Sequence, residues 1–153
     1  MMQFDQQKPL WGIDLGGTKI EGAILDPHRP EQAILRLRVP TEATGGYAHI
    51  LGQFSKLISL LEDASGMPRP SRIGVGTPGV MVPRTGLLKN SNTLCLNGRA
   101  LGNDLTRVLG CEVLLANDAN CCALAEATLG GAKGFKTVFG IILGTGVGGG
   151  VVV

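Results

Sequence analysis

Two glycine-rich segments near opposite ends of the sequence have the residue types of phosphate-binding turns. The first is Gly12-Ile-Asp-Leu-Gly-Gly-Thr-Lys19, and the second is Gly144-Thr-Gly-Val-Gly-Gly149. Glycine turns can point consecutive backbone N–H groups at an anion, and the Thr18 hydroxyl and the Lys19 ammonium would assist the first turn. Asp14, at the end of an apolar run, could position a hydrated magnesium ion. Either segment alone could be an ordinary structural hairpin, but two in one chain indicate two sides of one polyphosphate site.

Neither segment fits the standard motif that its letters suggest. The first differs from the phosphate loop GxxxxGK[ST] because threonine precedes lysine, and because a strand-like alternation follows where that motif needs a helix. The second matches GxGxxG, but a dinucleotide-binding fingerprint needs a helix at the third glycine and an acidic residue about 20 positions later. Three valines end the sequence instead. Both segments are therefore predicted to be strand–turn–strand units.

A carboxylate at a strand–helix junction is the candidate catalytic group. The segment Leu114-Leu-Ala-Asn-Asp118 runs from an apolar strand into a helical pattern. Ligands in α/β sheets usually bind at the carboxyl ends of the strands, where a carboxylate can accept the proton of an attacking hydroxyl during phosphoryl transfer. The structural alternative is that Asp118 is the N-cap of the helix, a role that aspartate favours. One residue can do both.

Two polar loops, at 76–79 and 89–93, follow a predicted central strand. They are rich in hydroxyl and amide groups and carry little charge. Such groups suit a polyol ligand, whose hydroxyls need paired donors and acceptors. Loops are generally polar, so this indication is weak without other evidence.

The elements that must position these groups follow the order β-β-β-α-β-α-β-α and end in two further strands. Alternating apolar residues predict strands at 10–14, 20–25 and 35–39, the last of them near a sheet edge. Helical spacing predicts helices at 47–61, 101–109 and 119–129, with Gly110 and the pair Gly130–Gly131 as C-terminal caps. Apolar runs predict strands at 73–76, 113–116, 138–143 and 149–153. Three antiparallel opening strands followed by βαβ crossovers predict an α/β fold with a mixed sheet.

Composition narrows the class of protein. The 153 residues are 44% apolar and 17% charged, as expected for a globular chain with its own core. A net charge of +2 from scattered basic residues gives no footprint for nucleic acid, and the uncharged stretch 137–153 is too short and too rich in glycine for a membrane span. Four cysteines without CxxC spacing, and no signal peptide, predict free thiols in a reducing, cytoplasmic compartment.

Taken in order, five segments resemble the ROK family of bacterial sugar kinases, within the actin and hexokinase superfamily. They are DLGGTK at 14–19, GTPG at 76–79, LLKNSNTLCLNG at 87–98, LLANDANC at 114–121 and LGTGVGGG at 143–150. The resemblance extends from about Leu10 to the last residue, and KNSNTLCLNG is most similar to the fructokinase branch, with N-acetylglucosamine kinases and glucokinases as close rivals. The resemblance implies an actin-like ATPase lobe, related to ribonuclease H.

The resemblance also implies ATP-dependent phosphorylation of a hexose, at the 6-hydroxyl, in a cleft between two lobes. Asp118 would be the catalytic base, and Asp14 would face magnesium. The sugar would be held by Asp118, Asn117, Asn92 and the backbone of Gly79. The ATP phosphates would be held by residues of the two glycine segments, namely Gly12, Asp14, Gly16, Gly17, Thr18, Lys19, Gly144, Thr145, Gly146, Val147, Gly148 and Gly149.

The same resemblance divides the chain in two. Residues 1–118 would form the N-terminal lobe that binds sugar and phosphate, and residues 119–153 would form a linking helix and the first hairpin of an incomplete second lobe. We therefore expect no turnover by these 153 residues alone, and no zinc, because Cys121 and Cys122 do not match the family's zinc site. A homodimer is possible, since family members are often dimers. A non-catalytic sugar-binding module, and a phosphotransferase acting on a carboxylate, remain alternatives.

Overall fold

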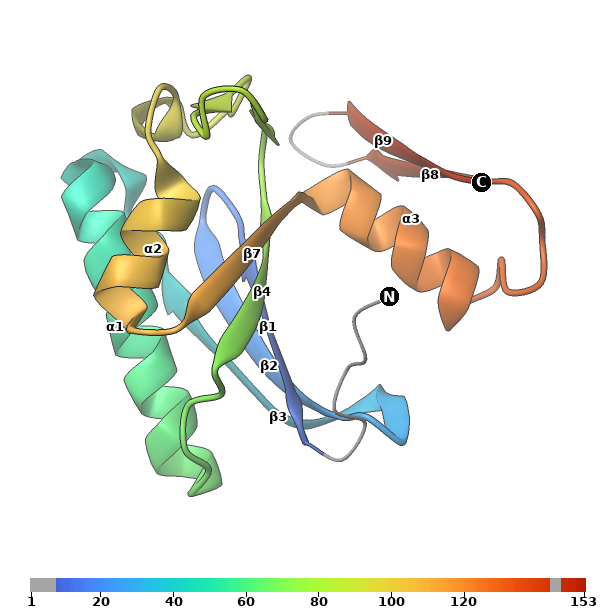
Figure 1. Cartoon of the computed structure of the whole chain (residues 1–153), viewed down its shortest axis with the longest axis horizontal. Helices are drawn as coiled ribbons and strands as arrows, with labels where there is room; N and C mark the ends of the chain where they lie inside the picture. The colour runs from blue at the N-terminus through green and yellow to red at the C-terminus, as the bar shows by residue number, and fades with distance from the viewer. Residues whose placement is uncertain (1–7, 144–146) are drawn as a thin grey trace.

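A computed structural model describes residues 8–143 and 147–153 (Figure 1). Its main sheet has the strand order β3-β2-β1-β4-β7. β1 (Leu10–Leu15), β2 (Lys19–Asp26) and β3 (Arg29–Pro40) are antiparallel neighbours, whereas β4 (Arg72–Thr77) and β7 (Glu112–Asn117) run parallel to β1. The predicted mixed sheet, with three antiparallel opening strands and β3 at its edge, is confirmed.

Two helices cover one face of this sheet. α1 (Gly46–Ser65) places Phe54, Leu57 and Leu61 at 0% exposure, and α2 (Leu101–Leu109) buries a leucine every fourth residue. α1 approaches β2 so closely that a Cβ atom on Gly22 would lie 2.8 Å from Cδ1 of Leu61. Each helix ends at a glycine in the left-handed region, as predicted for α2, because that conformation lets the glycine N–H close the last turn. Together these contacts form the hydrophobic core of the domain.

The connection from β4 to α2 contains structure that the sequence pattern did not predict. A short hairpin joins β5 (Val80–Met81) to β6 (Leu88–Lys89), and a single 3₁₀ turn, η2, spans Leu94–Leu96. Each strand has two residues, too few for any alternation to appear. This hairpin carries the two polar loops past the carboxyl end of β4. A second 3₁₀ turn, η1, spans Ala43–Gly45 between β3 and α1.

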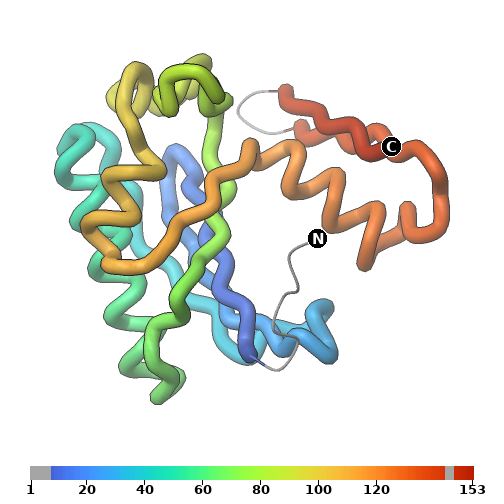
Figure 2. The backbone as a smooth tube through the Cα atoms, in the orientation of Figure 1, coloured from blue at the N-terminus to red at the C-terminus, as the bar shows by residue number. Residues whose placement is uncertain are grey.

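The last quarter of the chain, from residue 118 onward, lies apart from the two covering helices. α3 (Asp118–Thr128) follows β7 without a loop, and the antiparallel hairpin of β8 (Val138–Leu143) and β9 (Val147–Val152) packs along it. Figures 1 and 2 show α3 and this hairpin on the side of β7 away from α1 and α2. Within the described residues, no helix has the length and apolar character needed to cross a membrane.

Glycines let β8 and β9 lie close to α3. Cβ atoms on Gly140 and Gly148 would lie 2.9 and 3.3 Å from the Cβ atoms of Ala123 and Ala119, the small buried residues of α3. At Gly150 a Cβ would lie 2.8 Å from the Ala119 carbonyl oxygen. Gly148 of the second segment, and Gly140 and Gly150 outside it, therefore serve packing against α3. β9 also begins two residues before the predicted position.

The predicted glycine cap of α3 lacks the left-handed conformation that ends α1 and α2. The capping residue is Leu129, with φ −124°, and its N–H donates to the Ala125 and Glu126 carbonyls. Neither Gly130 nor Gly131 adopts a positive φ. Gly130 still donates its N–H to the Ala125 and Glu126 carbonyls, at 3.1 and 3.2 Å, and a Cβ atom on it would lie 2.9 Å from Cα of Glu126. Glycine is therefore required there for space, not for a left-handed conformation.

Candidate active site

The predicted functional residues of β1 and α3 meet at one edge of the sheet. Asp14 lies on the face opposite α1 and pairs in register with Gly76 of β4. A Cβ atom on Gly76 would lie 3.6 Å from Oδ1 of Asp14 and 3.9 Å from Cα of Asp118. The Asp14 carboxylate and the backbone of Asp118 therefore lie next to Gly76 at the carboxyl ends of the parallel strands, where α/β sheets usually bind their ligands.

Electrostatics at this edge favour a cation or a proton. Partial burial raises the pKa of Asp14, the negative charges of Asp118 and Glu21 raise it further, and Lys19 opposes them. Burial, followed by the charges of Asp118 and Asp14, also raises the pKa of the Cys121 thiol, which the sequence had not placed near the site. Within residues 8–143 and 147–153, no group of three His, Cys, Asp or Glu side chains could hold a metal. Two nearby carboxylates still suit magnesium, which is commonly held by one or two carboxylates plus substrate phosphates.

The N-cap of α3 is Asn117, not Asp118 as the structural alternative predicted. Asn117 Oδ1 accepts hydrogen bonds from the N–H groups of Ala119 (3.1 Å) and Asn120 (3.2 Å). Its Nδ2 donates to the Gly79 carbonyl at 2.9 Å. Both ends of the amide are therefore used within the chain, and Asn117 fixes the start of α3 against the loop after β4.

Because Asn117 caps the helix, the Asp118 carboxylate is only partly engaged. Its Oδ1 accepts from the Ala119 N–H at 2.8 Å. Its Oδ2 makes no hydrogen bond with any residue that the structure describes, and the side chain is half-buried. One oxygen is held by the backbone while the other remains available to a ligand.

The first glycine turn contains fewer residues than the predicted segment, because only Gly16–Lys19 form the turn. Gly16 donates its N–H to the Lys19 carbonyl at 2.9 Å, and Gly17 and Thr18 are exposed at the tip. The Lys19 ammonium forms an ion pair with the Glu21 carboxylate at 3.0 Å, so its charge already has a partner within the chain. Gly12 lies inside β1, two residues before Asp14, and the structure does not bring it to the turn.

The polar loop at 89–93 lies beside this turn. A Cβ atom on Gly17 would lie 3.8 Å from Oγ1 of Thr93. Asn97 fixes the loop through two hydrogen bonds with the Ser91 backbone, each 2.9 Å, a role that the sequence did not reveal. Asn92 is exposed on the loop, and its side chain has no hydrogen bond within the described part of the chain.

Gly79 and the second glycine segment complete the predicted site residues. Gly79 has φ +90°, and a Cβ there would lie 2.5 Å from the Lys89 carbonyl oxygen, so only glycine fits. Gly144, Thr145 and Gly146 lie outside the described residues. Val147, Gly148 and Gly149 begin β9, with Gly148 against Ala119, one residue beyond Asp118.

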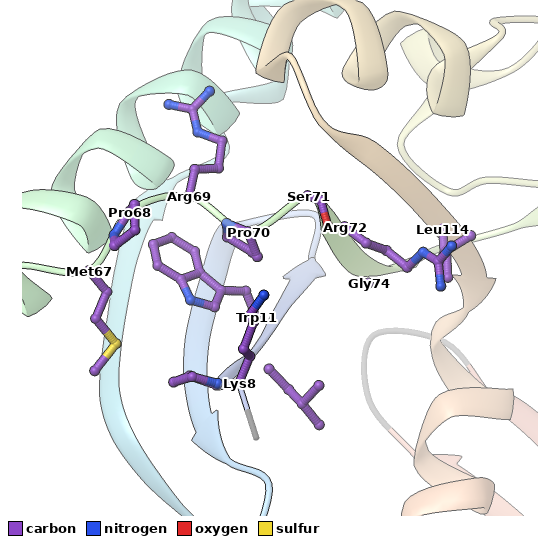
Figure 3. A pocket seen from close by; sticks show the side chains of 12 residues that line it. Lys8, Trp11, Met67, Pro68, Arg69, Pro70, Ser71, Arg72, Gly74 and Leu114 are labelled. Atoms are coloured by element: carbon purple, nitrogen blue, oxygen red, sulfur yellow. The ribbon is translucent and has the colours of Figure 1, made fainter. Parts of the chain in front are cut away.

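A separate cavity of about 930 Å³ lies at the opposite end of the sheet (Figure 3). Its lining includes Trp11, Arg69, Arg72 and Leu114, near the starts of β1 and β4. The carboxylates lie at the other ends of these strands, so the cavity is not part of the candidate site.

A mixed sheet that opens with an antiparallel hairpin, and that carries a glycine turn and two carboxylates at one edge, defines a lobe of the actin-like ATPase fold. The ROK family model matches residues 10–153. The chain belongs to the ROK family.

Relatives with curated functions are sugar kinases. The N-acetylgalactosamine kinase AgaK of Shewanella sp. (strain ANA-3) is 38% identical over 141 residues, covering 92% of this chain and 44% of the relative. The N-acetyl-D-glucosamine kinase of Erwinia tasmaniensis is 38% identical over 143 residues, covering 94% of this chain and 46% of the relative. The chain thus spans a little under half the length of these relatives.

Solved structures agree with the fold. The inorganic polyphosphate/ATP-glucomannokinase of Arthrobacter sp. strain KM superposes with a TM-score of 0.81 at 34% identity, covering 94% of this chain and 58% of that protein. A ROK family glucokinase from Streptomyces griseus, in complex with glucose and AMPPNP, gives a TM-score of 0.78 at 25% identity, covering 95% of this chain and 45% of that protein.

Proposed function

We propose that this chain contributes the catalytic base and a phosphate-binding turn to an ATP-dependent hexose kinase. The observation that carries the proposal is the state of Asp118, whose Oδ1 is held by the Ala119 N–H while its Oδ2 is free among the described residues. A general base needs a fixed position and an open lone pair within reach of the proton it takes. Membership of the ROK family and the kinase activities of the relatives support the assignment.

The residues of the chain would act in distinct ways. Asp118 would accept the proton of the sugar hydroxyl as that oxygen bonds to phosphorus. N–H groups of the turn at Gly16–Lys19 would face the phosphate oxygens, where charge develops in the transition state. Asp14 would hold Mg²⁺, which, when bound, neutralises charge on the transferring phosphate. The nearby charge of Asp118, which raises the pKa of Asp14, supports a cation between these carboxylates.

Asn92 and the loop at Gly79 would bind the sugar. Asn92 is exposed and unpaired among the described residues, which suits a direct contact with a hydroxyl. The Gly79 carbonyl already accepts from Asn117, so we assign Asn117 mainly to holding this loop and α3 in place. Val147, Gly148 and Gly149 would lead into the second phosphate-binding turn.

The sugar is a hexose or an N-acetylhexosamine. The relatives described above act on N-acetylgalactosamine and N-acetylglucosamine, and a structural neighbour binds glucose. The fructokinase specificity suggested by KNSNTLCLNG remains a prediction. A panel of fructose, glucose, mannose and both N-acetylhexosamines distinguishes these substrates.

The test uses the complete protein encoded by the gene that contains this sequence. With a coupled assay for ADP release, we expect Asp118→Asn to lower kcat about 10²- to 10⁴-fold, the usual contribution of a general base, while sugar binding measured by calorimetry is retained. Asp63→Asn, at an exposed carboxylate of α1, is the matched control and should leave kcat unchanged. An unchanged kcat in Asp118→Asn would contradict the proposal.

The same assay separates the alternatives. Sugar binding without ADP release would identify a non-catalytic binding module, and ADP release that does not depend on sugar would indicate another acceptor. The 153-residue chain, assayed in parallel, tests whether these residues turn over alone.

We also propose that the boundary between the two units falls at residues 118/119. Support comes from α3, which packs mainly on β8 and β9 rather than on the five-stranded sheet. Hydrogen exchange should then show two groups of amides with different opening free energies, divided at this boundary. A single uniform group would refute the division.

A further inference from the structure

Thr41 is a buried polar residue directly beside the first glycine turn. It follows the last residue of β3 and is 0% exposed. Its hydroxyl donates to the Gly16 carbonyl at 2.7 Å, and its N–H donates to the Thr18 carbonyl at 2.9 Å. One residue, distant in sequence, therefore holds two of the carbonyl groups of the turn, one through its side chain and the other through its backbone.

These bonds determine where the neighbouring N–H groups point. In a trans peptide the carbonyl of one residue and the N–H of the next point in opposite directions. With the Gly16 and Thr18 carbonyls directed at Thr41, the N–H groups of Gly17 and Lys19 are directed away from it. Gly17 and Lys19 are both exposed. The N–H groups that could receive an anion thus owe their direction to Thr41.

The hydroxyl of Thr41 also replaces the usual hydrogen bond of a turn. In a closed four-residue turn, the first carbonyl accepts from the fourth N–H. Here the Gly16 carbonyl accepts from Thr41, and no bond from the Lys19 N–H to that carbonyl closes the turn. The Lys19 N–H is not consumed inside the turn and stays available to a ligand.

Thr41 itself is held in place from α1. Gln53, a buried polar residue, donates through Nε2 to the Pro40 carbonyl (2.7 Å) and to the Glu42 carboxylate (3.1 Å). His49 also contacts the Glu42 carboxylate, at 2.8 Å. Glu42 has φ 48°, an unusual conformation for a residue other than glycine, and such residues persist where the surroundings determine them and often where function requires it. Both neighbours of Thr41 are thereby fixed.

We propose that Thr41 is a positioning residue that presets the Gly16–Lys19 turn for the phosphate groups of the donor. The inference rests on the proposed function only in identifying the anion as a nucleotide phosphate. Its consequence is specific: removing the Thr41 hydroxyl weakens binding of the donor and leaves binding of the sugar unchanged.

The first experiment follows backbone amides of the 153-residue chain by NMR during titration with tripolyphosphate and, separately, with Mg-ATP. In the wild-type chain the Gly17 and Lys19 amides should shift. Thr41→Val, nearly isosteric but without the hydroxyl, should weaken binding about threefold to tenfold, as expected for one lost hydrogen bond. Thr41→Ser should stay within about twofold of wild type. Thr44→Val, at an exposed threonine of η1, is the control and should change nothing.

Three results would overturn the inference: unshifted Gly17 and Lys19 amides in the wild type, wild-type affinity in Thr41→Val, or failure of Thr41→Ser to restore binding. If Thr41→Val does not fold, Gln53→Met replaces it. This variant releases the Pro40 carbonyl but keeps the Thr41 hydroxyl, and it should give a smaller loss that is again confined to the phosphate ligand. Unchanged phosphate affinity in Gln53→Met would then refute the positioning role of Thr41.

Kinetics of the complete protein separate this inference from the proposed function. Thr41→Val should raise the KM for ATP about threefold to tenfold with little change in the KM for sugar. An equal rise in both KM values would indicate general loosening and overturn a positioning role. If the wild-type protein phosphorylates no sugar, the proposed function fails, while the titration with tripolyphosphate still decides the role of Thr41.

Discussion

Asn117 joins α3 to the loop after β4, and Asn117→Ala tests that junction. The substitution removes the N-cap bonds to the N–H groups of Ala119 and Asn120, worth about 1 kcal/mol. It also removes the donor to the Gly79 carbonyl, worth about 1 kcal/mol more. The free energy of unfolding should therefore fall by about 2 kcal/mol. For a chain of this length that corresponds to a decrease in Tm of roughly 4–8 °C.

The assay is urea unfolding of the 153-residue chain, followed by circular dichroism at neutral pH. Asn117→Asp keeps a capping oxygen but cannot donate to Gly79, so it should lose roughly half as much stability, about 1 kcal/mol. Asn103→Ala, at an exposed position of α2, should stay within about 0.5 kcal/mol of wild type. If Asn117→Ala is as stable as Asn103→Ala, the junction does not hold α3 in place and the argument for its role is refuted.

Three further substitutions test local features, each by urea unfolding. Gly79→Ala should lower the free energy of unfolding by about 1–3 kcal/mol more than Gly86→Ala. Both glycines have positive φ, but only at Gly79 would the added Cβ meet backbone, 2.5 Å from the Lys89 carbonyl oxygen. Equal losses of stability in the two variants would contradict this clash. Asp14→Asn should stabilise the chain at pH 7, since a raised pKa means that the folded state disfavours the charged carboxylate. This gain is complete above the raised pKa and disappears below the ordinary value of 3.8, so a gain that persists at lower pH would refute it. Gly52→Ala, in α1 with nothing within 4 Å of the added methyl group, should raise the free energy of unfolding by about 0.5–1 kcal/mol. A decrease would mean that the methyl group meets a steric clash.

Periodic patterns predicted the long elements because their burial is regular. The apolar spacing at 47–61 reflects one buried stripe of α1, and the alternation at 20–25 reflects one buried face of β2. The hairpin of β5 and β6 escaped prediction because two-residue strands carry no period. Asn117 and Asp118 are equally good caps in sequence, and only the nearby Gly79 carbonyl shows why the amide takes that role.

The candidate site was predicted in its chemistry more fully than in its geometry. Asp14, Asp118 and the glycine turn were recognisable from residue type and position at strand ends, and the structure brings Asp14 and Asp118 next to Gly76. Gly12 was grouped with the turn by proximity in sequence, but it lies within β1. The part played by Thr41 had no signal in the sequence, since a lone threonine after a strand resembles any loop residue.

The amino-acid sequence by itself determined the order of the longer strands and helices, the family, and the residue types available for phosphoryl transfer, because these depend on local periodicity and short motifs. Tertiary structure alone decided which side-chain amide bonds to the Gly79 carbonyl, which glycines serve packing against α3, and which residue orients the phosphate-binding turn. Each of these depends on hydrogen bonds or contacts between segments far apart in the chain, whose distances no local pattern encodes.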